Sequence, residues 1–170
     1  MPAGLKQSSS VVSIGFSVAE PAPNTFTQGS VDLNLSPLDR EVFVVLAVNL
    51  DSGAPDAIAG VNTGIRSGLT TTSQTAMPTL ADANCLSRLS QDIRAAGFAD
   101  GGVGFISQAL ETPPSTLDYI GIIATNDFFV QVEGNGNVGA KGVSGKLYGY
   151  RAVASADIYA ALVQSEVLSA

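Results

Sequence analysis

The first half of the chain alternates apolar and polar residues, the pattern of β-strands with one buried face. Residues 12–18 place valine, isoleucine and phenylalanine at every second position, with serine and glycine between them. Residues 31–35 repeat the alternation, and Pro37 follows it, since proline has no N–H for a strand ladder. Residues 41–49 are apolar at almost every position, which predicts a strand covered on both faces.

The second half continues the same pattern. The threonine-rich residues 67–76 predict a strand with a small apolar face, and residues 103–110, 117–124 and 128–133 predict further strands. The glycine and asparagine residues at 133–137 predict a tight hairpin turn before a return strand at 144–153. About eight strands without βαβ alternation predict an all-β fold, an antiparallel eight-stranded β-sandwich of the jelly-roll kind.

Residues 82–97 fit two structures. Leu86, Leu89 and Ile93 lie at helical spacing, an asparagine or aspartate precedes them and Gly97 follows, so we predict a short helix. The alternative is a strand that carries Arg88, Gln91, Asp92 and Arg94 outward. The fold is therefore expected to contain one or two short helices.

Two segments are expected to need partners beyond their own sandwich. A C-terminal helix is predicted at 156–168 after Ser155, and its apolar residues surround most of its circumference. Residues 51–64 form a long loop without periodicity, which is typical of a contact element. The candidate subunit-contact residues in these two segments are Pro55, Ile58, Tyr159, Val163, Val167 and Leu168.

The chain length of 170 residues suits a single domain over 1–170, with residues 1–9 as a flexible N-terminal arm. The longest apolar run, 42–48, is far shorter than the roughly 20 residues that cross a bilayer, so no transmembrane segment is predicted. Residues 1–10 also lack the apolar stretch of a signal peptide.

Charge and histidine content narrow the function. Charged residues make up 14% of the chain, whereas about 25% is usual, which indicates a surface that meets other copies of the protein. The net charge of −7 argues against direct nucleic-acid binding. The absence of histidine excludes Ser-His-Asp chemistry and the usual zinc sites, and the single Cys85 has no CxxC partner. We therefore expect no enzyme, and no catalytic, metal or cofactor residue.

Residues 117–133, LDYIGIIATNDFFVQVE, and the later Gly149-Tyr150-Arg151-Ala152 resemble the single jelly-roll capsid proteins of tailless icosahedral viruses. The resemblance implies two packed four-stranded sheets and a capsid protein of the virion that self-assembles through symmetric contacts. Its partners would be copies of itself, other capsid proteins or an internal membrane. Residues 1–10 contain one lysine rather than a basic arm, so we expect this segment not to bind a genome.

Two other functions stay open. A subunit of an extracellular filament, sheath or surface layer would share the low charge and the strands, since a repeated contact that does not close produces a fibre. A carbohydrate-binding β-sandwich module would present Tyr148 and Tyr150 as an aromatic platform for sugar rings.

Overall fold

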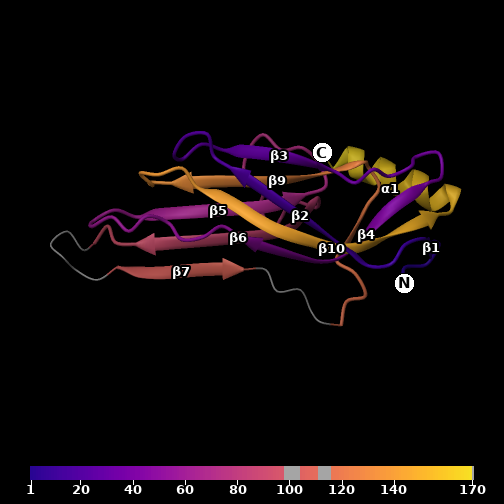
Figure 1. Cartoon of the computed structure of the whole chain (residues 1–170), viewed down its shortest axis with the longest axis horizontal. Helices are drawn as coiled ribbons and strands as arrows, with labels where there is room; N and C mark the ends of the chain where they lie inside the picture. The colour runs from indigo at the N-terminus through magenta and orange to yellow at the C-terminus, as the bar shows by residue number, and fades with distance from the viewer. Residues whose placement is uncertain (98–103, 111–115, 170) are drawn as a thin grey trace.

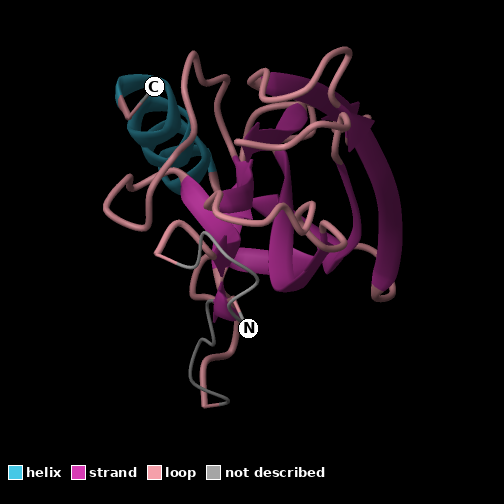
Figure 2. Cartoon of the chain, turned by 90° about the vertical axis from the view of Figure 1, so that its left-hand side faces the viewer, coloured by secondary structure: helices cyan, strands magenta, loops and turns pink. Residues whose placement is uncertain are grey.

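A computed structural model describes residues 1–97, 104–110 and 116–169. These residues form ten strands in two antiparallel sheets and one C-terminal helix, α1 (Ala156–Leu168) (Figure 1). The prediction of an all-β sandwich-like fold is confirmed, although the strands number ten rather than eight. Figure 2, which looks along the length of the molecule, shows the helix outside the strands on one side.

Sheet A is built around β10 (Gly142–Ala154), the longest strand. One edge of β10 pairs with β4 (Glu41–Asp51), which in turn pairs with the short β8 (Gly121–Ile123). Its other edge pairs with β2 (Val12–Ala19) over residues 142–149 and with β1 (Leu5–Gln7) over residues 152–154. β1 and β2 therefore lie end to end along the same edge of β10.

Sheet B has the strand order β3 (Thr27–Asp32), β9 (Asp127–Asn135), β5 (Thr63–Thr70), β6 (Cys85–Arg94) and β7 (Phe105–Leu110). Across the two sheets the pairing is nested. β2 pairs with β10, β3 with β9, β4 with β8 and β5 with β6. The chain therefore resembles one long hairpin folded over, in which the strands of the first half pair with those of the second half in reverse order.

Two apolar clusters stabilise these layers. The inner cluster lies between the sheets and contains Phe16 and Phe128, whose rings meet edge to face with centroids 5.8 Å apart. The outer cluster lies between sheet A and α1. β4 contributes Phe43 and Val45 to the inner cluster and alternates to place Val42 and Val44 in the outer one. The prediction that this strand is covered on both faces is confirmed for its first half, whereas Ala47 and Asn49 are exposed on one face of its second half.

The predicted helix at 82–97 is wrong, because β6 occupies residues 85–94. The apolar spacing fitted a helix, but Leu89 pairs with Ser67 of β5 and is buried in the sheet. The alternative prediction, a strand whose Arg88, Gln91, Asp92 and Arg94 side chains all point outward, is only partly right. The register with β5 places Arg88 and Asp92 on one face of the sheet, where the Asp92 carboxylate lies 3.7 Å from the Arg66 guanidinium. Gln91 lies on the other face, opposite Ile65.

Several further boundaries differ from the sequence expectations, and the strand predicted at 117–124 is confined to β8 at residues 121–123. β3 ends at Asp32 rather than continuing to residue 35, and β5 begins at Thr63 and ends before most of the threonine run. Residues 1–9 are not wholly a flexible arm, because Leu5–Gln7 form β1 and Leu5 is buried in the outer cluster. The C-terminal helix has the predicted bounds, although the Ser155 side chain makes no capping hydrogen bond.

Candidate functional site: a helix-end contact surface

The inward face of α1 packs on sheet A and determines which helix residues are left for partners. Tyr159, Leu162 and Val163 contact the outer cluster, and Glu166 continues their stripe one turn later. The helix therefore uses one face for its own sandwich, and two of the predicted contact residues, Tyr159 and Val163, belong to that face.

Glu166 fixes the C-terminal turn of the helix to the segment that follows β8. Its carboxylate accepts hydrogen bonds from the Ala124 N–H at 2.8 Å, the Thr125 N–H at 3.3 Å and the Thr125 hydroxyl at 2.6 Å. Burial raises the pKa of the Glu166 carboxyl above its usual 4.5, although each of these three hydrogen bonds acts to lower it. The end of α1 is thereby held in one position.

The opposite face of α1 is exposed and nearly uncharged. It carries Ala160, Ala161 and Gln164, and Asp157 is the one charged residue among the exposed positions of the helix. At its end Val167 and Leu168 are 60% and 76% exposed. Apolar side chains that stand together on a rigid end of a molecule are typical of a protein contact surface.

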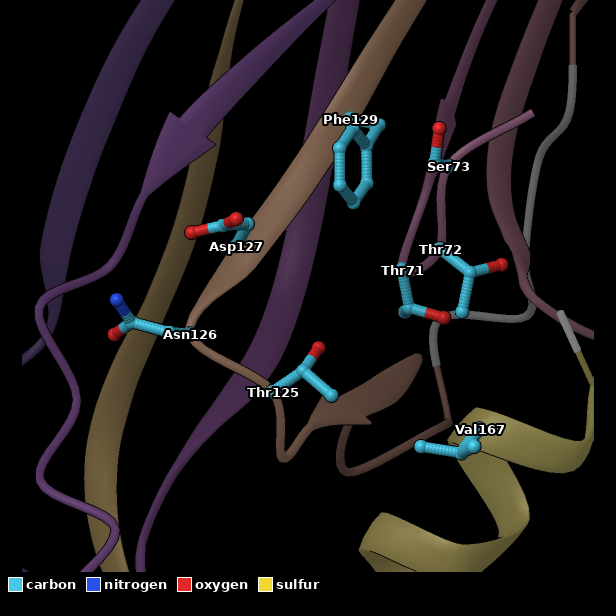
Figure 3. A pocket seen from close by; sticks show the side chains of 8 residues that line it. All are labelled: Thr71, Thr72, Ser73, Thr125, Asn126, Asp127, Phe129 and Val167. Atoms are coloured by element: carbon cyan, nitrogen blue, oxygen red, sulfur yellow. The ribbon is translucent and has the colours of Figure 1, made fainter. Parts of the chain in front are cut away.

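A pocket of about 280 Å³ adjoins Val167, the first of these two residues. It is formed by the segment that follows β5, the turn that leads into β9, and Val167 of the helix (Figure 3). Its lining residues are Thr71, Thr72, Ser73, Thr125, Asn126, Asp127, Phe129 and Val167. This volume is slightly below the range of about 300–1,000 Å³ that is usual for small-molecule sites.

Hydrogen bonds hold both walls of this pocket. The Asn84 amide donates to the Thr72 hydroxyl and, at 3.3 Å, to the carbonyl of Ser169, so the segment after β5 is tied to the end of the helix. On the other wall, Thr125 is bonded to Glu166. We call Val167, Leu168 and this pocket the helix-end surface. Sequence patterns indicated its helix residues but gave no signal for Thr71, Asn84 or Phe129.

The other predicted contact segment lies at the opposite end of the sandwich (Figure 1). Pro55 is buried within its own chain and Ile58 is half-buried. Asp56 fixes this loop to the β9–β10 hairpin, accepting hydrogen bonds from the Val138 and Gly139 N–H groups at 2.9 Å each. Of the six predicted contact residues, the structure thus brings only Val167 and Leu168 together on an exposed surface.

The polar residues at this opposite end stabilise the fold by joining its loops. The Asp56 carboxylate also binds the Lys141 ammonium at 2.5 Å, and hydrogen bonding from Gly139 and then Lys141 lowers its pKa. The buried Glu20 carboxylate accepts from the N–H groups of Thr25, Gly134 and Lys141. Sequence analysis missed this network because its members come from loops far apart in the chain.

The alternative sugar platform is not exposed. Tyr150 lies in the outer cluster beneath α1 at 7% exposure, so only Tyr148 of the pair has appreciable access to solvent. Within the described ranges, the histidine-free chain brings together no group of three acidic or cysteine side chains able to hold a metal ion. In the same residues, no helix has the length and apolar character needed to cross a bilayer.

Comparison with models of known protein families gives no match, and comparisons with curated proteins and with solved structures give none either. The functional argument therefore rests on the strand pairing and the surface of this chain.

Proposed function

We propose that this chain is a single jelly-roll subunit that self-assembles into a viral capsid shell. The observation that carries the proposal is the nested strand pairing, in which β2, β3, β4 and β5 pair with β10, β9, β8 and β6. With β1 as a continuation of β2 and β7 as an added edge strand, eight strands remain, in the orders β2-β10-β4-β8 and β3-β9-β5-β6. Two four-stranded sheets linked in this way are the arrangement of a jelly roll.

Jelly rolls occur in viral capsids, lectins and cupins. The capsid role is favoured by the helix-end surface, where Val167 and Leu168 stand on a helix held in place by Glu166. With a net charge of −7, copies of the chain meet with less repulsion at an uncharged surface of this kind than at the charged parts of the molecule. The lectin role is less favoured because Tyr150 is buried.

The proposed contact is heterologous: Val167 and Leu168 of one subunit meet a different surface of the next. Such a contact produces a closed shell when the rotation between neighbours closes, and a fibre when it does not. A filament or surface-layer subunit is therefore the alternative, with the same residues in contact and a different particle shape.

The test is electron microscopy and light scattering of the purified full chain, with Leu168→Lys as the variant. A lysine at this position is compatible with the negative end of the helix dipole, so α1 should remain folded, while an unpaired ammonium in a dry contact costs several kcal/mol. We expect closed particles from the unchanged protein and at least about a tenfold higher concentration threshold for the variant, which corresponds to about 1.4 kcal/mol.

Leu80→Lys is the matched control, because Leu80 is 60% exposed on the loop between β5 and β6 and is not among the residues that line the pocket, so this variant should assemble normally. Tubes instead of closed particles would establish the filament alternative. A protein that stays monomeric at millimolar concentration, or a Leu168→Lys variant that assembles like Leu80→Lys, would contradict the proposal for this surface.

A further inference from the structure

Among the described residues, β7 stands at the border of sheet B. In the described part of the chain it pairs with β6 alone, along the border of sheet B (Figure 1). β6 lies opposite sheet A, since its Leu86 packs in the inner cluster against Gly121 of β8. β7 lies one strand further out, and residues 105–109 are all exposed, with Phe105 at 59% and Ile106 at 66%.

Within its six residues, β7 has none of the sequence features that usually prevent edge strands from pairing. Edge strands are commonly protected by charged residues, proline, a bulge or very short length. The strand Phe105–Leu110 contains no charged residue and no proline, and its pairing with β6 is regular over all six residues. By contrast, β8 at the border of sheet A is three residues long, and β2 and β3 pack on each other where Val18 meets Gly29.

The sequence of β7 is also suited to antiparallel pairing with a second copy of the same strand. Its order, Phe-Ile-Ser-Gln-Ala-Leu, has a polar centre between two apolar ends, so it has the same polarity in both directions. Two antiparallel copies related by a two-fold axis place one residue opposite itself. With Ser107 on the axis, Phe105 faces Ala109 of the second copy; with Gln108 on the axis, Ile106 faces Leu110.

We propose that β7 pairs antiparallel with the β7 of a second copy of this chain, so that the two B sheets become one continuous sheet across a two-fold axis. A second copy fits better than an unrelated peptide because, on the face that carries the axis residue, both registers match polar with polar and apolar with apolar residues. The other face sets Ile106 against Gln108 in the first register and Ser107 against Ala109 in the second. The strand is also uncharged within a chain of net charge −7, so two copies approach there without like charges meeting. The pairing uses a different surface from the helix end and is compatible with a shell, a filament or a free dimer.

The sharpest test is disulfide trapping in full-length protein that carries Cys85→Ser. Cα atoms opposite each other in antiparallel strands lie about 4.5–5.5 Å apart, within the range that a disulfide spans. Ser107→Cys and Gln108→Cys each place a cysteine on one of the two possible axes, and Leu80→Cys supplies an exposed cysteine elsewhere. With copper phenanthroline as oxidant, we expect a linked dimer on a non-reducing gel for one of the two β7 variants at more than about ten times the Leu80→Cys yield.

A second measurement avoids new cysteines. Ile106→Lys protects the edge with a charge. In protein that also carries Leu168→Lys, which weakens the helix-end contact, light scattering should show a monomer, whereas Leu168→Lys alone, or combined with Leu80→Lys, should show a dimer. Circular dichroism and urea titration establish that the variant is folded. The proposal is overturned if neither β7 cysteine links above the control, or if Ile106→Lys leaves the mass unchanged. Linked dimers without particles would contradict only the shell, and particles without β7 links would contradict only this pairing.

Discussion

At the scale of single residues, Gly149 shows how closely β10 approaches its neighbour. The register between β10 and β4 shifts at this position, and a Cβ on Gly149 would overlap the Val44 carbonyl oxygen and the Phe43 ring. Neither group can move without disturbing the core. We therefore expect Gly149→Ala to lower the free energy of unfolding in urea by about 1–3 kcal/mol.

The neighbouring strand supplies the control for this substitution. A Cβ on Gly15 of β2 would have the Gly145 carbonyl oxygen as its nearest neighbour, at 4.0 Å, which is ordinary contact. Gly15→Ala should therefore change the unfolding midpoint little. Equal losses in the two variants would show that glycine content, rather than the close approach at Gly149, limits the stability of the sheet.

Glu166 makes the docking of the helix depend on pH. Because burial raises the folded pKa of this carboxyl above 4.5, the folded state favours the protonated form. Its stabilising contribution is complete below the unfolded pKa and is lost as the pH rises through the higher folded pKa. Glu166→Gln keeps an acceptor oxygen and does not ionise, so the variant should lack this part of the pH dependence.

The measurement is the urea unfolding free energy of both proteins from about pH 4 to about pH 8. The unchanged protein should lose stability relative to Glu166→Gln as the pH rises, because other ionisable groups contribute equally to both proteins. If the difference in unfolding free energy between the two proteins does not change with pH, or if the unchanged protein gains stability relative to Glu166→Gln as the pH rises, the raised pKa assigned to Glu166 is wrong. Glu166→Ala, which removes all three hydrogen bonds, should cost about 1–3 kcal/mol at the acidic end of this range and less as the pH rises.

At the scale of elements, the sequence pattern was sufficient to predict those strands and helices that bury an apolar face against a neighbouring layer. β2, β4, β9, β10 and α1 were predicted within a few residues, since alternation or helical spacing reflects the layer that each packs on. β6 was mistaken for a helix because Leu86, Leu89 and Ile93 satisfy helical spacing. Pairing on both edges, with β5 and β7, overrides that local preference.

The candidate contact surfaces were harder to predict than the strands. Tyr159 and Val167 are both apolar residues of one helix, and only the docking of Glu166 on Ala124 decides which is covered and which is exposed. β7 was expected as a strand, but its place at the border depends on the order of pairing across the whole chain. Long-range pairing of this kind leaves no local trace in sequence.

At the scale of the whole molecule, the nested pairing joins distant parts of the chain into one unit. β10, near the C-terminus, is the central strand of sheet A and pairs with β1 and β2 from the N-terminus. β4 contributes alternate residues to the inner and the outer cluster, so neither cluster can separate without exposing the other. We therefore expect the sandwich and the helix layer to unfold together.

The tyrosines allow this cooperativity to be measured. The chain has no tryptophan, and Tyr119, Tyr150 and Tyr159 all pack in the outer cluster, so tyrosine fluorescence reports on the helix layer. Far-ultraviolet circular dichroism reports on both sheets, and the two signals should give the same urea midpoint and slope. A fluorescence transition at lower urea would mean that α1 detaches first. In that case Val42 and Val44 would be uncovered in a folded sandwich, and the helix layer would be an exchangeable cover rather than part of the core.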